Sequence, residues 1–183
     1  MKKLITIVLL AGLAAGCATS PSSNLFTLDM SPSEGAGSPV NIAVGRFRIA
    51  ESLHNKRILI KKSPTEIEYY AAAQWAASLD ELLREKLASE FGPVDTARQT
   101  YVLSGALQAF EQVDMESGNV AHVKLALEIR KQDVSQYATP EIAKTYEVTL
   151  LVKGGSAGSV VKALSTCLET AARDIVADIA ALQ

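Results

Sequence analysis

Residues 120–130 read Val-Ala-His-Val-Lys-Leu-Ala-Leu-Glu-Ile-Arg, and this stretch decides the fold. Apolar side chains recur at every second position from Val123 to Ile129. The positions between and beside them are occupied by His122, Lys124, Ala126, Glu128 and Arg130. A period of two is typical of a strand in a sheet that is buried on one face and wet on the other. The buried face of that sheet needs a cover from another element.

Further strand patterns lie on both sides of this stretch. Residues 101–113 and 142–152 predict two more long strands, so the second half of the domain reads as three consecutive strands. Earlier in the chain, a short apolar strand is expected at residues 25–28. A further strand is expected at 40–44, continuing through 46–49, and a hairpin from 57–61 and 66–70 around a Ser63-Pro64 turn.

Two amphipathic helices supply the expected cover. The first has apolar residues at helical spacing from Trp75 to Phe91 and a stop signal at Gly92-Pro93. Its regular start is expected near Ser78, because Glu81 three residues later completes a capping box. The second helix ends the chain, with its apolar face at Val161, Leu164, Leu168, Ala171, Ala172, Ile175, Ile179 and Leu182. The sequence therefore predicts one α+β domain at residues 25–183. It is a two-layer domain, with a mainly antiparallel sheet and both helices packed on one face.

The first seventeen residues predict an exported and lipidated protein. Lys2 and Lys3 precede an uncharged run, and small residues lead up to Gly16 and Cys17. The run is shorter than the ~20 residues that span a bilayer, so residues 1–16 are interpreted as a cleaved signal peptide. The pattern resembles a bacterial lipobox, which implies cleavage between Gly16 and Cys17 and attachment of diacylglycerol and an N-acyl chain to Cys17. The alternative is an ordinary cleaved signal with an unmodified Cys17.

Residues 17–24 are expected to tether the domain to a membrane. They are small and polar after Cys17, and a flexible coil of that length spans roughly 15 Å. The position after Cys17 is Ala18, not the Asp that retains such lipoproteins at the inner membrane. The expected location is therefore the periplasmic, inner leaflet of the outer membrane.

Composition restricts the partners and the covalent chemistry. The chain has 183 residues with a formal net charge of −2 and no basic patch, which argues against nucleic acid as a partner. Its length suits one ordinary domain. Cys17 and Cys167 are the two cysteines, so acylation of Cys17 leaves Cys167 without a disulfide partner. Cys167 lies beside the apolar positions of the last helix and is expected to be a small buried side chain.

No catalytic, cofactor or metal residue is expected. Residues 154–158 match the G-x-S-x-G pattern of a nucleophile elbow, but the histidine that this chemistry requires after the serine is missing, because His122 is the last histidine. The same loop lacks the lysine of a phosphate-binding P-loop. His54 and His122 have no second ligand at zinc spacing. We therefore expect that the protein is not an enzyme.

Tyr69, Tyr70 and Trp75 form the single aromatic cluster. Packing in the core, where a strand meets a helix, is the favoured interpretation. A partner-docking surface is the alternative, because aromatic side chains are common at protein interfaces.

The layout resembles the ABC-type transport auxiliary lipoprotein family. The matching features are the lipobox, Phe26-Thr27-Leu28, Tyr69-Tyr70 and the Trp75-Ala-Ala-Ser-Leu79 segment that opens the helix. The resemblance implies a non-catalytic periplasmic subunit of an MCE-type system, similar to the Mla and Pqi systems, that moves phospholipid or other hydrophobic molecules between the two membranes. The implied partners are an MCE-domain protein, an ABC permease and its ATPase. Two alternatives remain open at this point, an outer-membrane lipoprotein that activates a peptidoglycan synthase and a stand-alone lipid carrier.

Overall fold

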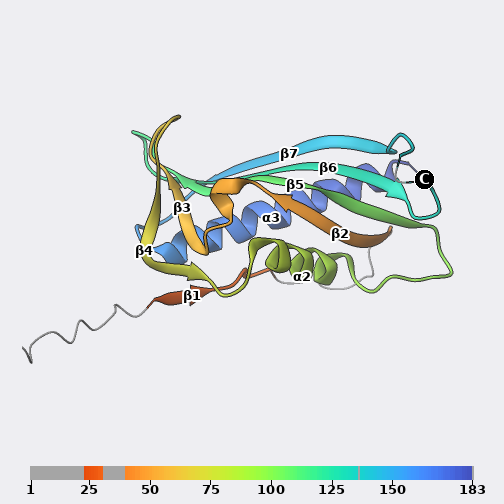
Figure 1. Ribbon diagram of the computed structural model, residues 1–183, viewed down its shortest axis with the longest axis horizontal. Helices are drawn as coiled ribbons and strands as arrows, with labels where there is room; N and C mark the ends of the chain where they lie inside the picture. The colour runs from red at the N-terminus through yellow and green to blue at the C-terminus, as the bar shows by residue number, and fades with distance from the viewer. Residues whose placement is uncertain (1–22, 31–39, 136, 183) are drawn as a thin grey trace, which may run out of the picture.

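The computed structural model describes residues 23–30, 40–135 and 137–182, and these form one sheet with two long helices on the same face (Figure 1). The strands are β1 (Asn24–Phe26), β2 (Asn41–Ile49), β3 (Arg57–Lys61), β4 (Ile67–Trp75), β5 (Thr100–Val113), β6 (Val120–Lys131) and β7 (Ile142–Leu151). The helices are the short η1 (Glu51–Leu53), α2 (Leu79–Phe91) and α3 (Ala157–Ala180). This arrangement confirms the predicted α+β class with both helices on one face.

The sheet has the strand order β1-β4-β3-β5-β6-β7, and β2 also pairs with β5. Strands β5, β6 and β7 form an antiparallel meander, which is the part that the alternation in residues 120–130 predicts. Strands β2 and β3 both run parallel to β5, β2 along its first half and β3 along its last residues. The sheet is therefore mostly antiparallel with some parallel pairs, and β5 is its central strand.

The two faces of β6 differ as the alternation predicts. Ala121, Val123, Leu125, Leu127 and Ile129 are buried beneath the helices, at 2% exposure or less. The intervening side chains lie on the open face and are exposed or half-buried. The hydrophobic effect thus fixes the orientation of the strand, since a register slip of one residue would exchange the two sets.

Helix α2 begins and ends at the predicted signals. The Ser78 hydroxyl accepts a hydrogen bond from the backbone nitrogen of Glu81 at 3.3 Å, which makes Ser78 the N-cap. Gly92 follows the last turn with a φ of 79°, a conformation that glycine adopts at low cost. The helix buries Leu79, Leu82, Leu83, Leu87 and Phe91.

Helix α3 begins earlier than its apolar stripe suggests. The Ser156 hydroxyl accepts from the backbone nitrogen of Ser159 at 3.2 Å, so the Gly-rich loop ends in a helix cap. The helix ends at Ala180, and Leu182, which the sequence places on the buried stripe, is 41% exposed beyond that end. The buried stripe therefore ends at Ile179, in the last turn of the helix.

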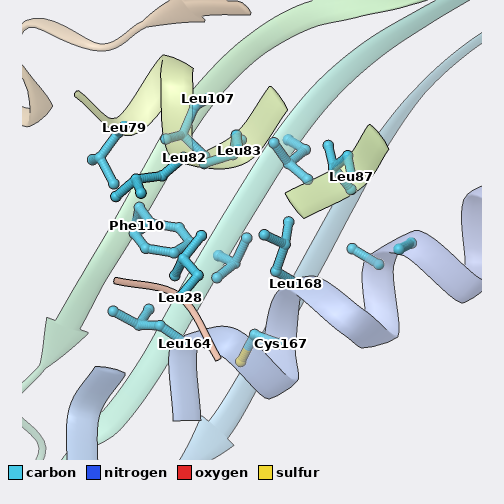
Figure 2. Packing of buried hydrophobic residues seen from close by; sticks show 14 of the residues in the cluster. Leu28, Leu79, Leu82, Leu83, Leu87, Leu107, Phe110, Leu164, Cys167 and Leu168 are labelled. Carbon is cyan, nitrogen blue, oxygen red and sulfur yellow. The ribbon is translucent and has the colours of Figure 1, made fainter. Parts of the chain in front are cut away.

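The core lies between the sheet and the two helices. Figure 2 shows Leu28 and Phe110 between the side chains of α2 and those of α3. Each fully buried leucine or phenylalanine contributes roughly 1.5–3 kcal/mol through the hydrophobic effect. Within the described residues, no helix is long and apolar enough to cross a membrane.

Strand β4 is longer than the sequence predicts. The expected strand stops at residue 70, but β4 continues to Trp75, where its last three residues pair in parallel with β1. Trp75 therefore ends the strand and is buried just before α2 begins at Leu79, as expected for core packing where a strand meets a helix. This pairing joins residues 24–26 to residues 73–75, and no local pattern in the sequence encodes such a long-range contact.

Candidate functional site

The predicted lipidation site lies outside the described residues. Gly16 and Cys17 precede Ser23, the first residue that the structure describes, and so does most of the expected tether. The chain enters the domain at β1, which lies at the edge of the sheet. The side chain of Leu25 in this strand is 66% exposed.

The three aromatic residues of the predicted cluster do not share one surface. Trp75 is 2% exposed and its ring packs against Phe110, with the centroids 5.5 Å apart and the planes tilted by 56°. Tyr69 and Tyr70 are half-buried. In this conformation Trp75 belongs to the core, and only the two tyrosines have surface to offer a partner.

The hydroxyls of both tyrosines tie β4 to neighbouring elements. The Tyr69 hydroxyl donates to the carbonyl oxygen of Ser52 in η1 at 2.8 Å. The Tyr70 hydroxyl donates to the Oε1 atom of Gln112 in β5 at 2.6 Å, and burial raises its pKa. These bonds fix the β3–β4 hairpin against the end of β5.

A chain of polar groups continues from Tyr70 to the surface. The Gln112 Nε2 atom donates to the Oδ1 atom of Asp114 at 2.5 Å, and the Lys62 Nζ atom donates to the Oδ2 atom of Asp114 at 2.7 Å. The bond from Lys62 lowers the pKa of Asp114, and the same bond raises the pKa of Lys62. No sequence pattern predicts this network, because its members are separated in the chain by up to 52 positions and meet only through the pairing of β3 with β5.

An apolar row crosses the open face at the same end of the sheet. It follows the register from β4 to β7, and its members are Ile67, Val113, Val120 and Leu151, with Lys61 between Ile67 and Val113. Ile67 is 46% exposed and Leu151 is 60% exposed. We name these five residues the end row. Ile67 and Leu151 are thus the exposed ends of this row, and Val113 and Val120 between them are half-buried.

An ionic cluster occupies the open face further along β6. The His122 Nδ1 atom lies 3.3 Å from the Glu111 Oε1 atom, and its Nε2 atom lies 2.8 Å from the Glu147 Oε1 atom. The Lys124 Nζ atom lies 2.9 Å from the Glu147 Oε2 atom. Glu111 is 7% exposed, so the histidine meets a buried carboxylate on one side and a solvent-facing one on the other.

Charge explains the protonation states in this cluster. The hydrogen bond with Glu111, supported by Glu147, raises the pKa of His122 against the opposing effect of burial. The hydrogen bonds from Lys124 and His122 lower the pKa of Glu147. A protonated His122 that donates to both carboxylates accounts for the geometry.

The side chains that could act as nucleophiles, Ser156 and Cys167, serve structural roles. Ser156 of the G-x-S-x-G match caps α3, and its hydroxyl lies 3.0 Å from that of Ser159. Cys167 is fully buried in the core, as the sequence predicts, and burial raises the pKa of its thiol to about 12. Across the described ranges, no group of three or more His, Cys, Asp or Glu residues is arranged to hold a metal ion.

One comparison with known proteins shows the family. A family model described as "ABC-type transport auxiliary lipoprotein component" matches residues 26–176. No curated protein matches the chain.

Two solved structures share the fold. Protein XCC0632 from Xanthomonas campestris, which carries the family designation DUF330, is 18% identical, with a TM-score of 0.68 over 84% of this chain and 93% of that chain. An uncharacterized protein is 14% identical, with a TM-score of 0.67 over 86% of this chain and 99% of that chain. At these identities the similarity shows the fold alone.

Proposed function

The chain belongs to the ABC-type transport auxiliary lipoprotein family, and from this membership we propose that it is a periplasmic subunit of an MCE-type ABC transport system. The family match over residues 26–176 carries the proposal, because it spans nearly all of the described sheet and both long helices. The cargo is phospholipid or another hydrophobic molecule that passes between the inner and outer membranes. The partners are an MCE-domain protein, the permease and the ATPase.

In this proposal the protein is held at the outer membrane by acyl chains on Cys17. Support comes from Lys2, Lys3 and the small residues that lead to Cys17, and from Ala18 at the sorting position. Each buried methylene contributes about 0.8 kcal/mol, so two or three chains anchor the protein far more firmly than one. The seven residues 17–23 precede β1 and keep the domain close to the membrane surface.

The role of the domain in this proposal is docking without catalysis. The end row offers the docking surface, since Ile67 and Leu151 expose apolar side chains and the two tyrosines hold the adjoining hairpin in place. Its occupant is the MCE-domain protein. Support for a non-catalytic role comes from His122, whose ring nitrogens both lie against carboxylates, and from Cys167, which is buried.

The proposal is tested by purifying the tagged lipoprotein from membranes in mild detergent after chemical crosslinking, with mass spectrometry of the bound proteins. The expected result is recovery of an MCE-domain protein with its permease and ATPase. Recovery of a peptidoglycan synthase, or of no MCE-domain protein after crosslinking, would contradict the proposal.

The docking surface has a sharper test. A photo-crosslinking residue at position 67 or 151 is expected to capture the MCE-domain protein, whereas the same residue in place of Arg173, which is exposed on α3, is not. Equal capture from all three positions would remove the end row from the proposal.

The anchor is tested by Cys17→Ala in the full chain. Loss of metabolic palmitate labelling and release of the protein from the membrane fraction are expected. Unchanged labelling would show that Cys17 is not the acylated residue.

A further inference from the structure

A basin of about 500 Å³ lies on the open face of the sheet, away from the helices. It extends across four strands, from β2 through β5 and β6 to β7. Small residues line its middle, and these are Ser104, Gly105, Ala126, Ala143 and Thr145. Its volume is within the range of small-molecule sites, which is about 300–1,000 Å³.

The backbone around this basin is irregular and closely packed. The pairing of β2 with β5 is irregular between Val44 and Phe47, which is typical of a β-bulge that bends a strand. On the β5 side, a Cβ atom at Gly105 would collide with the backbone oxygen of Ala126. Ala106 and Ala126 face each other across β5 and β6, so short side chains continue the floor.

Two arginines border the basin on the β2 side. Arg46 and Arg48 are exposed, and Phe47 between them is buried at 6% exposure. Alternation along a strand therefore places both arginines on the open face, with their guanidinium groups beside the hollow. Within residues 23–30, 40–135 and 137–182, neither arginine forms an ion pair.

The other charged residues that line the basin are already neutralised by partners. The Glu128 Oε2 atom lies 2.7 Å from the Arg130 Nη2 atom. The Lys144 Nζ atom lies 2.6 Å from the Asp178 Oδ2 atom. The basin is thus left with two uncompensated positive charges on a chain whose formal net charge is −2.

We propose that this basin binds a phosphate group, held by the guanidinium groups of Arg46 and Arg48. Guanidinium groups bind phosphate through paired, charge-assisted hydrogen bonds. The Ser104 hydroxyl lies in the floor and is placed to donate a further bond. The proposal deepens the proposed function and rests on it for the identity of the cargo, because phosphate is the group that a phospholipid presents to water. A phospholipid headgroup and free phosphate share this chemistry, and the experiment separates them.

The experiment is calorimetric titration of the detergent-solubilised full chain at physiological salt with three probes. Glycerophosphoglycerol represents the deacylated phosphodiester headgroup, inorganic phosphate represents the free ion, and glycerol lacks phosphate. Saturable binding of at least one phosphate probe, without binding of glycerol, is expected. Binding of glycerophosphoglycerol alone identifies a headgroup, and binding of inorganic phosphate alone identifies the free ion.

Substitutions then locate the site. Arg46→Gln with Arg48→Gln is expected to weaken binding at least about tenfold, since charged hydrogen bonds are lost. Arg46→Lys with Arg48→Lys keeps the charge but not the paired geometry and is expected to weaken binding to a lesser degree. The matched control is Arg84→Gln with Arg173→Gln, which removes two exposed arginines from the helices and is expected to leave binding unchanged.

Two outcomes would overturn the proposal. One is no binding of either phosphate probe to the wild-type chain. The other is an equal loss in the control variant, which would indicate attraction to net charge instead of a site. Neither outcome depends on a transporter partner, so a failure here is distinct from a failure to recover the MCE-domain protein.

Discussion

The two faces of strand β6 differ in what holds them together. On the helix side, Leu125 and its neighbours are buried by nonpolar contact with α3 and the rest of the core. On the open side, Lys124 and His122 are held by ion pairs with residues of β5 and β7. The contacts of the buried face therefore follow from the apolar residues of β6, which are visible in its own sequence. The contacts of the open face depend on which residues of β5 and β7 are paired with β6.

The largest expected effect is on the buried face. Leu125→Ala should lower the free energy of unfolding by roughly 2–5 kcal/mol, because it removes buried methyl groups and leaves a cavity. Denaturant unfolding measures the change. If Leu125→Ala lowered the free energy of unfolding no more than Lys124→Ala does, the two faces would not differ in their contribution to stability.

The next effect is on the open face, at His122. Its substitution by Gln should cost about 1–3 kcal/mol, since the buried Glu111 loses its charged partner. Circular dichroism during denaturant unfolding gives the value. Glu147→Gln is the matched control and should cost less, because Glu147 is exposed.

The same residue predicts a pH dependence. The pKa of His122 is raised above its ordinary value of 6.5, so folding favours the protonated form. Its contribution is fully present below about pH 6.5 and is lost as the pH rises through the higher folded-state pKa. Stability measured at increasing pH should therefore fall more steeply in the wild type than in His122→Gln. Parallel curves would show that His122 is not the group responsible.

An effect of similar size is expected at Gly105, where the backbones of β5 and β6 approach closely. Gly105→Ala should destabilise the protein by about 1 kcal/mol or more, because the new Cβ atom meets the backbone oxygen of Ala126. Gly155→Ala is the control, since nothing lies within 4 Å of its added Cβ atom. Thermal unfolding of the two variants compares them directly, and equal midpoints would argue against the close approach at Gly105.

The smallest effect is expected at Lys124. Its ion pair with Glu147 is partly exposed, and removal by Lys124→Ala should cost roughly 0.2–1 kcal/mol. The loss should shrink further in high salt, because salt screens exposed charges. A salt-independent loss would indicate that packing of the lysine stem matters more than its charge.

The same contrast explains which features the sequence predicts. Alternation in residues 120–130, the Ser78 cap and the apolar stripe of α3 are local signals, and the structure confirms all three except for Leu182 at the end of the stripe. The parallel pairing of β1 with β4 was not predicted, because it joins segments about fifty positions apart.

In the candidate site, the difference between local signals, which the sequence predicts, and long-range contacts, which it does not, is larger. Gln112 and Lys62 belong to no pattern in the sequence, and they join Tyr70 in one network only when β3, β4 and β5 are in register. Among the described residues Arg46 and Arg48 form no ion pair, and this too is a property of the folded sheet. Cys17, by contrast, is predicted from a contiguous pattern and remains a prediction.

The position of β5 has a consequence for the order of folding. Among the described residues, β2 pairs with no strand other than β5, whose first residue lies 51 positions after the last residue of β2. Because a chain is synthesised from its N-terminus, β2 emerges first and stays unpaired until β5 has also emerged. Long-range parallel pairing of this kind is slow, and unpaired strands are prone to aggregate in the meantime. The nascent chain is consequently expected to need protection until residue 107, the last partner of β2, has emerged.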